Sequence, residues 1–421
     1  MGLKPRPKRT TLQQLNTSHE IATIMSDMSH KAFKYRFYPT PEQDTLLRRT
    51  MGCTRLVYNQ ALSVRTEAWY KDKQRVGYND TSAMLTLWKK NLELDFLNEV
   101  SCVPLQQGLC HLQKAFSNFC DGRAKYPNLK KKRNGGSVEF TKSAFKIRDG
   151  QVNLAKCSEP LSMRWSRSLP KGDPPSTITV KLSPAGRWTG SLLVDVEIEP
   201  LLKSPNEIGV DVGSASLVAL STGKKIANPK GFKAKYSKLR RSQKALSRKQ
   251  KESNNRYKAR LKVAKVHQEI MDAIEDLLHK LTIRLVRENP TIALEDLAVK
   301  NRVKNRKRDL SISDASWGEL IKQVEYKCEW YDRTLIKIDR GFPSSQGCFD
   351  GGHIVEKLPL NIREWDGPKC RTHHDRDVNS ALNILAALLA VSVCGAKVRP
   401  NRDTLKGCCE IPVSGQKQKP K

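Results

Sequence analysis

The sequence has few acidic residues and no long apolar run, and each shortage excludes a class of protein. Its longest apolar stretch, residues 381–394, is shorter than the roughly 18 residues that span a bilayer, so we interpret it as a buried helix. Residues 1–30 contain no apolar centre, which argues against a secretory signal. The start of the chain also lacks a myristoylation pattern. We therefore expect no membrane partner.

The shortage of acid leaves 76 Lys and Arg against 43 Asp and Glu, a net charge of +33. Such a surface repels itself unless a polyanion neutralises it, and nucleic acid is the usual polyanion. The charge alone does not show an enzyme, because some ribosome-associated and structural proteins are equally basic. The 11 cysteines are scattered and odd in number, which disfavours a disulfide framework. We expect an intracellular, reducing compartment and a cytoplasmic, nucleoid-associated protein.

The first half of the chain changes from a helical to a β pattern. Residues 31–38 alternate apolar and basic side chains, which is the period of a strand. Thr40 and Pro41 then form a helix start, and helical patterns continue to about residue 121. Apolar residues that can supply a helical core are Trp69, Trp88, Phe96, Leu105, Leu109, Leu112 and Phe116. Three short strand patterns follow, at residues 138–145, 176–182 and 191–198.

From residue 207 strands alternate with helices, which predicts a mixed sheet flanked by helices. The expected strands are residues 208–212, 217–220, 291–295 and 335–339, and the long helices fall within residues 230–289. The fold class is therefore α+β with several domains. Residues 1–30 and 394–421 are expected to be a flexible leader and tail.

Three acidic residues in the second half of the chain lie at the ends of expected elements. Asp211 and Glu295 end two apolar strands, and Asp377 precedes an apolar helix. Taken singly, they could be a turn residue, an exposed strand end and a helix N-cap. Together they could converge at one end of a sheet, where Mg²⁺ takes a few carboxylates plus water and phosphate oxygens. The two neighbouring acids are not expected to join them. Asp296 should lie on the other side of the strand, and Asp375 should lie outside the helix cap.

Ten motifs, in order, make the chain resemble the TnpB family, the transposon-encoded relatives of type V CRISPR effector nucleases. They occupy residues 31–43, 57–59, 124–127, 184–188, 209–213, 294–297, 303–306, 312–315, 342–346 and 373–379. The resemblance implies that Asp211, Glu295 and Asp377 are the catalytic carboxylates of a RuvC/RNase H-like nuclease domain that binds Mg²⁺ or Mn²⁺. It also implies two partners, a guide RNA and a double-stranded DNA target.

The resemblance divides the chain as follows. Residues 31–40 and 126–205 would form a wedge-like β-barrel, and residues 41–125 a helical recognition lobe. The nuclease domain would take residues 206–342 and 372–393. Within the lobe, the matching helices suggest Tyr78, Ser82 and Gln106 as readers of a short DNA motif flanking the target.

Residues 343–371 would be a zinc ribbon, but a degenerate one. The family's two Cys-x-x-Cys pairs become Cys348 to Gly351 and Gly367 to Cys370. Tetrahedral zinc sites use four N or S ligands. Cys348 and Cys370 could recruit His353, His373 or His374, or the loop could be held by packing alone. We expect substoichiometric zinc or none.

Basic residues fall into three patches, which suits a long polyanion such as a guide–target heteroduplex. The expected contacts to the nucleic-acid backbone are Lys130, Lys131, Lys132, Arg133, Lys238, Arg240, Arg241, Lys244, Arg248, Lys249, Arg256, Lys304 and Arg306. The leading hypothesis is an RNA-guided DNA endonuclease. The rivals are a nuclease-silent RNA-guided repressor and an accessory transposase. The sequence leaves the oligomeric state open.

Overall fold

The computed structural model describes most of the chain between residues 28 and 394. The described ranges are 28–132, 135–170, 172–202, 204–213, 216–227, 231–296, 311–339, 341–356, 358–359 and 361–394. The predictions for Arg133, Lys304, Arg306, the tail beyond residue 394 and most of the leader lie outside these ranges. Within them, no helix is both long and apolar enough to cross a membrane.

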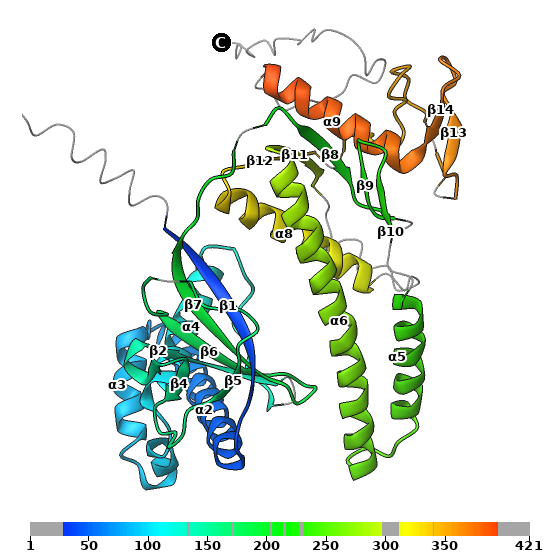
Figure 1. Cartoon of the computed structure of the whole chain (residues 1–421). Helices are drawn as coiled ribbons and strands as arrows, with labels where there is room; N and C mark the ends of the chain where they lie inside the picture. Colours follow the sequence, from blue (N-terminus) through cyan, green and yellow to red (C-terminus); the bar gives the residue numbers. More distant parts are fainter. Residues whose placement is uncertain are drawn as a thin grey trace, which may run out of the picture. The chain divides into compact units, whose positions relative to one another are not determined.

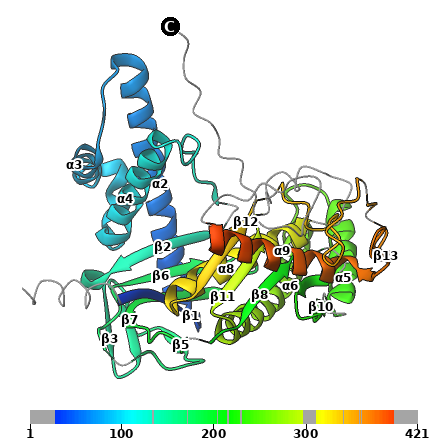
Figure 2. The ribbon, with the colours of Figure 1, turned by 90° about the horizontal axis from the view of Figure 1, so that it is seen from above.

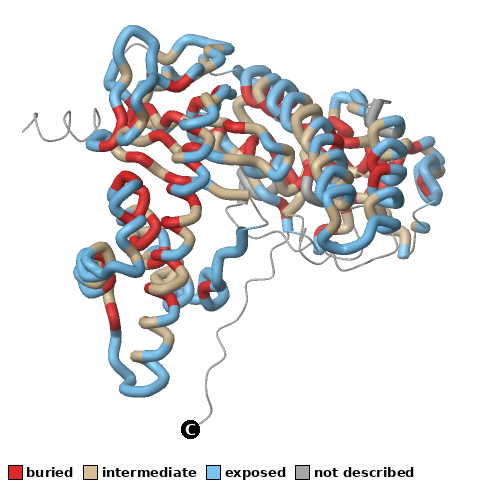
Figure 3. The backbone as a smooth tube through the Cα atoms, turned by 90° about the horizontal axis from the view of Figure 1, so that it is seen from below, coloured by how far each residue is buried: buried red, intermediate tan, exposed pale blue. Residues whose placement is uncertain are grey.

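The chain separates into two compact units (Figure 1). Unit 1 comprises residues 1–198 and 250–265, and unit 2 comprises residues 199–249 and 266–421. Each unit has its own buried core, and buried residues follow the inner stripes of the helices and the middle of the strands (Figure 3).

Unit 1 contains a five-stranded antiparallel sheet in the order β2-β6-β7-β1-β5. Along β1 (Met28–Tyr38), Phe33, Tyr35 and Phe37 are buried while the intervening side chains face water, as the alternation predicted. The other strands are β2 (Gly136–Thr141), β5 (Ser162–Arg164), β6 (Thr177–Leu182) and β7 (Trp188–Glu197). β3 (Phe145–Arg148) and β4 (Gln151–Leu154) form a hairpin. Among the described residues no strand pairing closes this sheet into the predicted barrel.

Three helices pack together in unit 1 (Figure 2): α2 (Pro41–Asp72), α3 (Tyr78–Trp88) and α4 (Cys102–Cys120). A short 3-10 helix, η1 (Leu92–Asn98), joins α3 to α4. The predicted start of α2 is confirmed, because Thr40 and Gln43 exchange side-chain-to-backbone hydrogen bonds in a capping box. Leu105, Leu109 and Leu112 are buried as expected.

Two of the predicted core aromatics are wrong. Trp69 and Phe96 are 46% and 39% exposed. Both side chains are apolar, as core residues are. Helical periodicity identifies the apolar face of a helix, but it does not say how much of that face the neighbouring helices cover.

Unit 2 contains a mixed five-stranded sheet in the order β10-β9-β8-β11-β12. β11 (Thr291–Glu295) lies between β8 (Glu207–Asp211) and β12 (Thr334–Ile338) and is parallel to both. β9 (Ser216–Leu220) and β10 (Lys225–Ala227) complete the sheet through antiparallel pairs. The mixed sheet and the positions of its strands agree with the sequence prediction to within a residue or two.

Helices cover both faces of this sheet. α9 (Arg376–Cys394) lies across one face, and α8 (Ser311–Trp330) and the second half of α6 (Asn254–Glu288) lie on the other (Figures 1 and 2). α5 (Gly231–Ser247) is a separate helix antiparallel to α6. The predicted helical stretch from residue 230 to 289 is thus two helices.

The approach of α9 to β8 requires a glycine. A Cβ at Gly209 would overlap the carbonyl oxygen of Ala381 and would lie 2.8 Å from the backbone nitrogen of Leu385. Both of these atoms belong to the helix backbone, which cannot swing aside as the end of a side chain could. Gly209 therefore sets how closely the helix and the strand pack.

We expect Gly209→Ala to destabilise unit 2 by about 1–3 kcal/mol or more, as overpacking does. Gly52→Ala in α2 is the matched control, since its Cβ would meet only the end of Arg55, 3.9 Å away. Alanine favours a helix over glycine by about 1 kcal/mol, so that change should be neutral or stabilising. Chemical denaturation of both variants makes the measurement. Equal stability of Gly209→Ala and wild type would contradict the packing argument.

Candidate functional site

Asp211 and Glu295 end two neighbouring parallel strands at the same edge of the unit 2 sheet. The register pairs Leu294 with Val210, so Glu295 stands opposite Asp211 one residue further on. Paired strands lie about 4.8 Å apart, which makes the two carboxylates neighbours. Both residues are half-buried. Their side chains share the sheet face of Gly209 and Ala293, because side chains two residues apart point the same way.

Asp377 reaches this edge from α9. Its helix packs on the face that carries Gly209 and Ala293, and Asp377 lies one turn before Ala381, the residue against Gly209. The side chain of Asp377 is only 10% exposed. Burial and the nearby Arg363 lower the pKa of Arg376, whereas the negative charges of Asp377 and then Asp211 raise it. Asp211 and Asp377 therefore act on the same guanidinium group.

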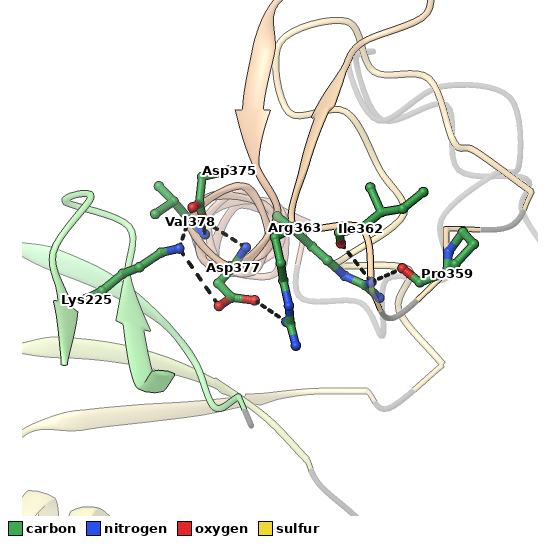
Figure 4. A network of polar contacts seen from close by, with 8 residues as sticks. Lys225, Pro359, Ile362, Arg363, Asp375, Asp377 and Val378 are labelled. Atoms are coloured by element: carbon green, nitrogen blue, oxygen red, sulfur yellow. Dashed lines mark hydrogen bonds and ion pairs between the residues drawn. The ribbon is translucent and has the colours of Figure 1, made fainter. Parts of the chain in front are cut away.

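Three cations surround Asp377, and sequence reasoning missed all of them. Figure 4 shows Lys225 of β10 and Arg363 approaching its carboxylate from two sides, at 3.9 and 3.5 Å. Arg376 donates hydrogen bonds to the backbone oxygens of Pro359 and Ile362 (2.7 and 3.4 Å). No local pattern marks Lys225 or Arg363, because they come from a strand edge and a loop remote in sequence.

The donor set fits a hard divalent cation. Asp211, Glu295 and Asp377 offer carboxylate oxygens, the ligands that Mg²⁺ and Mn²⁺ prefer. Asp377 is largely withdrawn from solvent, and Lys225 and Arg363 balance its charge in this structure. The residues therefore suit the metal that the sequence predicted.

The ribbon segment, residues 343–371, brings two cysteines and one histidine together. Cys348 Sγ lies 3.3 Å from Cys370 Sγ and 3.0 Å from His374 Nε2. The three donor atoms lie within 4.8 Å of one another. His374 is therefore the histidine that joins the two cysteines.

The other two candidate histidines, His353 and His373, have different surroundings. His373 Nδ1 lies 2.8 Å from Asp366 instead, and among the described residues the group of donor atoms does not include His353. Burial raises the pKa of the Cys348 thiol. Hydrogen bonds from Thr372 lower the pKa of the Cys370 thiol.

The candidate readers of a DNA motif occupy two helices of unit 1. Tyr78 and Ser82 lie one turn apart on α3 and are half-buried, and Gln106 on α4 is exposed. A hydrogen bond with Cys110 raises the pKa of Tyr78, while one with Ser82 opposes the shift. Because Cys110 is one turn from Gln106, these contacts bring the three candidates to the same side of the helix pair.

The basic residues predicted to contact the nucleic-acid backbone differ in how far they are exposed. Lys238, Arg240, Arg241, Lys244, Arg248 and Lys249 are all exposed, and Arg256 at the start of α6 is half-buried. Lys238 also pairs with Glu269 of α6 at 3.2 Å. α5 thus presents a dense basic surface.

Lys130, Lys131 and Lys132 lie in an exposed loop of unit 1. Asn59 fixes this loop, because its side-chain oxygen accepts from Lys130 N (2.8 Å) and its amide donates to Lys130 O (3.1 Å). The Lys130 ammonium lies 4.0 Å from the centre of the Tyr58 ring. The motif at residues 57–59 therefore anchors the start of the basic loop.

Comparisons with known proteins identify the family of this chain. A Streptomyces pristinaespiralis protein named "Putative RNA-guided DNA endonuclease" is 54% identical over 90% of this chain and 94% of its own length. The chain belongs to the TnpB family. The Escherichia coli protein named "Putative RNA-guided DNA endonuclease InsQ" is 30% identical over 88% of this chain and 96% of its own length.

Three family descriptions match segments of this TnpB-family chain. They are "Probable transposase" (residues 191–306), "Helix-turn-helix domain" (residues 25–74) and "Cas12f1-like, TNB domain" (residues 317–384). The solved "Cas12f1-sgRNA-target DNA complex" matches with a TM-score of 0.55 at 14% identity, over 85% of this chain and 99% of that one. This likeness confirms the predicted α+β, multi-domain fold.

Asp375 corrects one sequence expectation. It was expected outside the helix cap, but it is the cap of α9, since its Oδ1 accepts from the backbone nitrogens of Asp377 and Val378 (3.1 and 3.0 Å). Its carboxylate also pairs with Lys225. Burial raises its pKa, but the hydrogen bond and the positive charge of Lys225, together with the two backbone hydrogen bonds, outweigh burial and leave the pKa below its usual value. The N-cap of α9 is therefore Asp375 and not Asp377.

We expect Asp375→Ala to lower the free energy of unfolding of this TnpB-family chain by about 1 kcal/mol, the usual cost of losing a cap. Asp375→Asn keeps a capping oxygen but not the charge, and asparagine caps about as well as aspartate. It should therefore stay close to wild type in chemical denaturation. If Asp375→Asn is as unstable as Asp375→Ala, the ion pair with Lys225 matters more than the cap.

Proposed function

We propose that this chain is an RNA-guided endonuclease that cuts guide-matched double-stranded DNA beside a short flanking motif. The proposal is supported by the placement of Asp211 and Glu295 at the ends of adjacent parallel strands, with α9, which carries Asp377, packed on the same face of that sheet. The names of the two relatives support the same activity.

The three carboxylates would hold Mg²⁺ or Mn²⁺ at the scissile phosphate. Metal bound there would supply a hydroxide and stabilise the leaving oxygen of the phosphodiester. The surrounding residues have separate tasks. The Asp375 cap fixes the first turn of α9, and with it the position of Asp377.

Lys225 and Arg363 would help to place the phosphate. Their side chains are 34% and 44% exposed beside the nearly buried Asp377, so each can approach an entering anion. Arg376 is committed to the ribbon backbone through its two hydrogen bonds. It would hold Arg363 in place, since its own backbone nitrogen also donates to Arg363 O (2.8 Å).

Guide and target would bind mainly through phosphates. The exposed basic residues of α5 and the loop anchored by Asn59 are the candidate contacts. Tyr78, Ser82 and Gln106 would read the flanking motif from α3 and α4. Phosphate contacts position a nucleic acid, whereas base contacts give sequence preference.

Two rival functions make different demands on these residues. A nuclease-silent repressor would not need the acidic residues, so the presence of all three favours cutting. A transposase that joins DNA ends by tyrosine chemistry would need a His-x-His metal pair, which the sequence does not contain. The description "Probable transposase" for residues 191–306 is compatible with an accessory role beside the nuclease activity.

We expect Asp211→Ala, Glu295→Ala and Asp377→Ala each to reduce DNA cleavage by more than about 100-fold, since losing even a residue that supports a metal ligand costs about 10–100-fold. Binding of RNA and target should change little, because phosphate-facing cations supply the affinity. The assay uses the chain expressed with the DNA that flanks its gene, with co-purifying RNA sequenced to define the matched target.

Asp296→Ala is the control, because Asp296 follows Glu295 and points to the opposite face of the strand. It should retain more activity than the three variants. Cleavage should require Mg²⁺ or Mn²⁺ and stop with EDTA, while Ca²⁺, with its looser coordination, should support binding better than cutting. A wild-type complex with its own RNA, a correct target and Mg²⁺ that never cuts would favour the silent repressor.

The basic surface of α5 generates a separate prediction. Arg241 and Lys244 are exposed neighbours on one face of the helix. Replacing both by alanine should flatten the dependence of log K on log salt by about 1.4–1.8, since each lost phosphate contact contributes about 0.7–0.9. Filter binding of the co-purified RNA at several salt concentrations measures this slope.

Lys280→Ala serves as the comparison, because Lys280 already pairs with Asp276 on α6 at 2.7 Å. That variant should keep the wild-type slope. An unchanged slope in the Arg241 and Lys244 double variant would exclude α5 as a phosphate-binding surface.

A further inference from the structure

Two glycines of the ribbon segment face the cluster of Cys348, Cys370 and His374. A Cβ at Gly351 would lie 3.1 Å from Cys370 Sγ and 3.2 Å from Cys348 Sγ. A Cβ at Gly367 would lie 2.5 and 2.9 Å from the same two sulfurs. Any side chain at either position would point into the cluster, so the glycines leave one side of it without a protein donor.

His374 is fixed where it can act as the third donor. It lies in β14 (His373–Asp375), which pairs with β13 (Glu364–Asp366) and opposes His374 to Trp365. The two rings pack against each other at a tilt of 40°, with centroids 5.0 Å apart, and His374 is 6% exposed. Its ring therefore has one packed orientation, with Nε2 directed at Cys348.

Cys348 is fixed from α9. Asn379 donates to Gly347 O (2.6 Å) and accepts from Phe349 N (3.0 Å), and so holds the residues on both sides of Cys348. Asn383 also donates to Gly347 O (2.7 Å). These side chains are buried. Cys348 is thus held in place by hydrogen bonds to the backbone on both sides of it.

The spacing of the donors suits a tetrahedral thiophilic ion. A Zn–S bond of about 2.3 Å gives a separation of roughly 3.8 Å between two sulfurs in a tetrahedron. The observed separations, 3.3 Å between sulfurs and 3.0 Å from sulfur to nitrogen, require only a small expansion.

We propose that Cys348, Cys370 and His374 bind one thiophilic cation of the Zn²⁺ type through three protein ligands, with the fourth position, beside Gly351 and Gly367, open to a small exogenous ligand. Structural zinc sites usually close all four positions, and an open position belongs to sites that exchange ligands. The ion should therefore bind and leave more readily than in a four-cysteine ribbon. This inference does not rest on the proposed nuclease activity.

Co²⁺ titration of the full-length chain tests the proposal, with excess Mg²⁺ present to occupy the carboxylate site. One Co²⁺ per chain should give a thiolate-to-cobalt charge-transfer band and the visible bands of a four-coordinate ion. Adding a small thiol or imidazole should shift these bands in the wild type. Absence of the charge-transfer band would overturn the proposal, and a spectrum indifferent to added thiol would show that a fourth protein ligand closes the site.

Variants separate the roles of the neighbouring residues. His374→Ala should weaken Co²⁺ binding at least about tenfold, whereas His373→Ala, whose ring faces Asp366, should bind like wild type. Equal affinity of His374→Ala and His373→Ala would remove His374 from the site.

Gly351→Cys gives a test by gain of a ligand, which holds even if the alanine variants misfold. It should bind Co²⁺ more tightly than the wild type, and its spectrum should no longer respond to added thiol. Gly351 has the more room of the two glycines, and the nearest atoms that its Cβ would meet are the sulfurs of the two cysteines. Unchanged affinity in Gly351→Cys would show that Gly351 does not border the open position.

Discussion

The contact of the α9 backbone with the β8 backbone at Gly209 is the constraint on which the rest of unit 2 depends. Only a strand without a side chain at that point lets the helix carbonyl of Ala381 lie against the sheet. The contact fixes the height of the helix above the strands, and the start of the helix follows from it. Asp377 is one turn before Ala381, and Asp211 is two residues after Gly209. A shift of the helix away from the sheet would separate the two carboxylates.

The same helix also holds the ribbon segment, which explains why its first half is polar although it is buried. Asp375 caps it, Asp377 faces the sheet edge, and Asn379 and Asn383 bind the backbone around Cys348. Arg363 and Arg376 connect the ribbon to Asp377 directly. Buried polar groups of this kind are stable only when each has partners, and here the partners come from two parts of the chain. Loss of order in the ribbon would therefore change the surroundings of Asp377.

Local signals in the sequence were sufficient for most of the elements and for the positions of Asp211 and Glu295 at the ends of two strands. Thr40, Pro41 and Gln43 specify the start of α2, and apolar runs ending in an acid specify β8 and β11. The contacts of Lys225 and Arg363 with Asp377 could not be predicted, because they depend on how a strand edge and a loop fold back on a helix. It could not be predicted either that His374, and not His373, lies beside Cys348. Adjacent residues of a strand point to opposite faces, and the sequence does not say which face meets Cys348. The boundary of α9 was misplaced because Asp375 and Asp377 are equally good capping residues, and only the hydrogen bonds distinguish them.

Anomalous diffraction from crystals grown with Mn²⁺ would test most directly whether the three carboxylates form one metal site. The account predicts anomalous density within about 2.1 Å of oxygens from Asp211, Glu295 and Asp377, with Lys225 and Arg363 near the ion but not bound to it. Density confined to other surfaces, with Asp377 still held by Lys225 and Arg363, would contradict it.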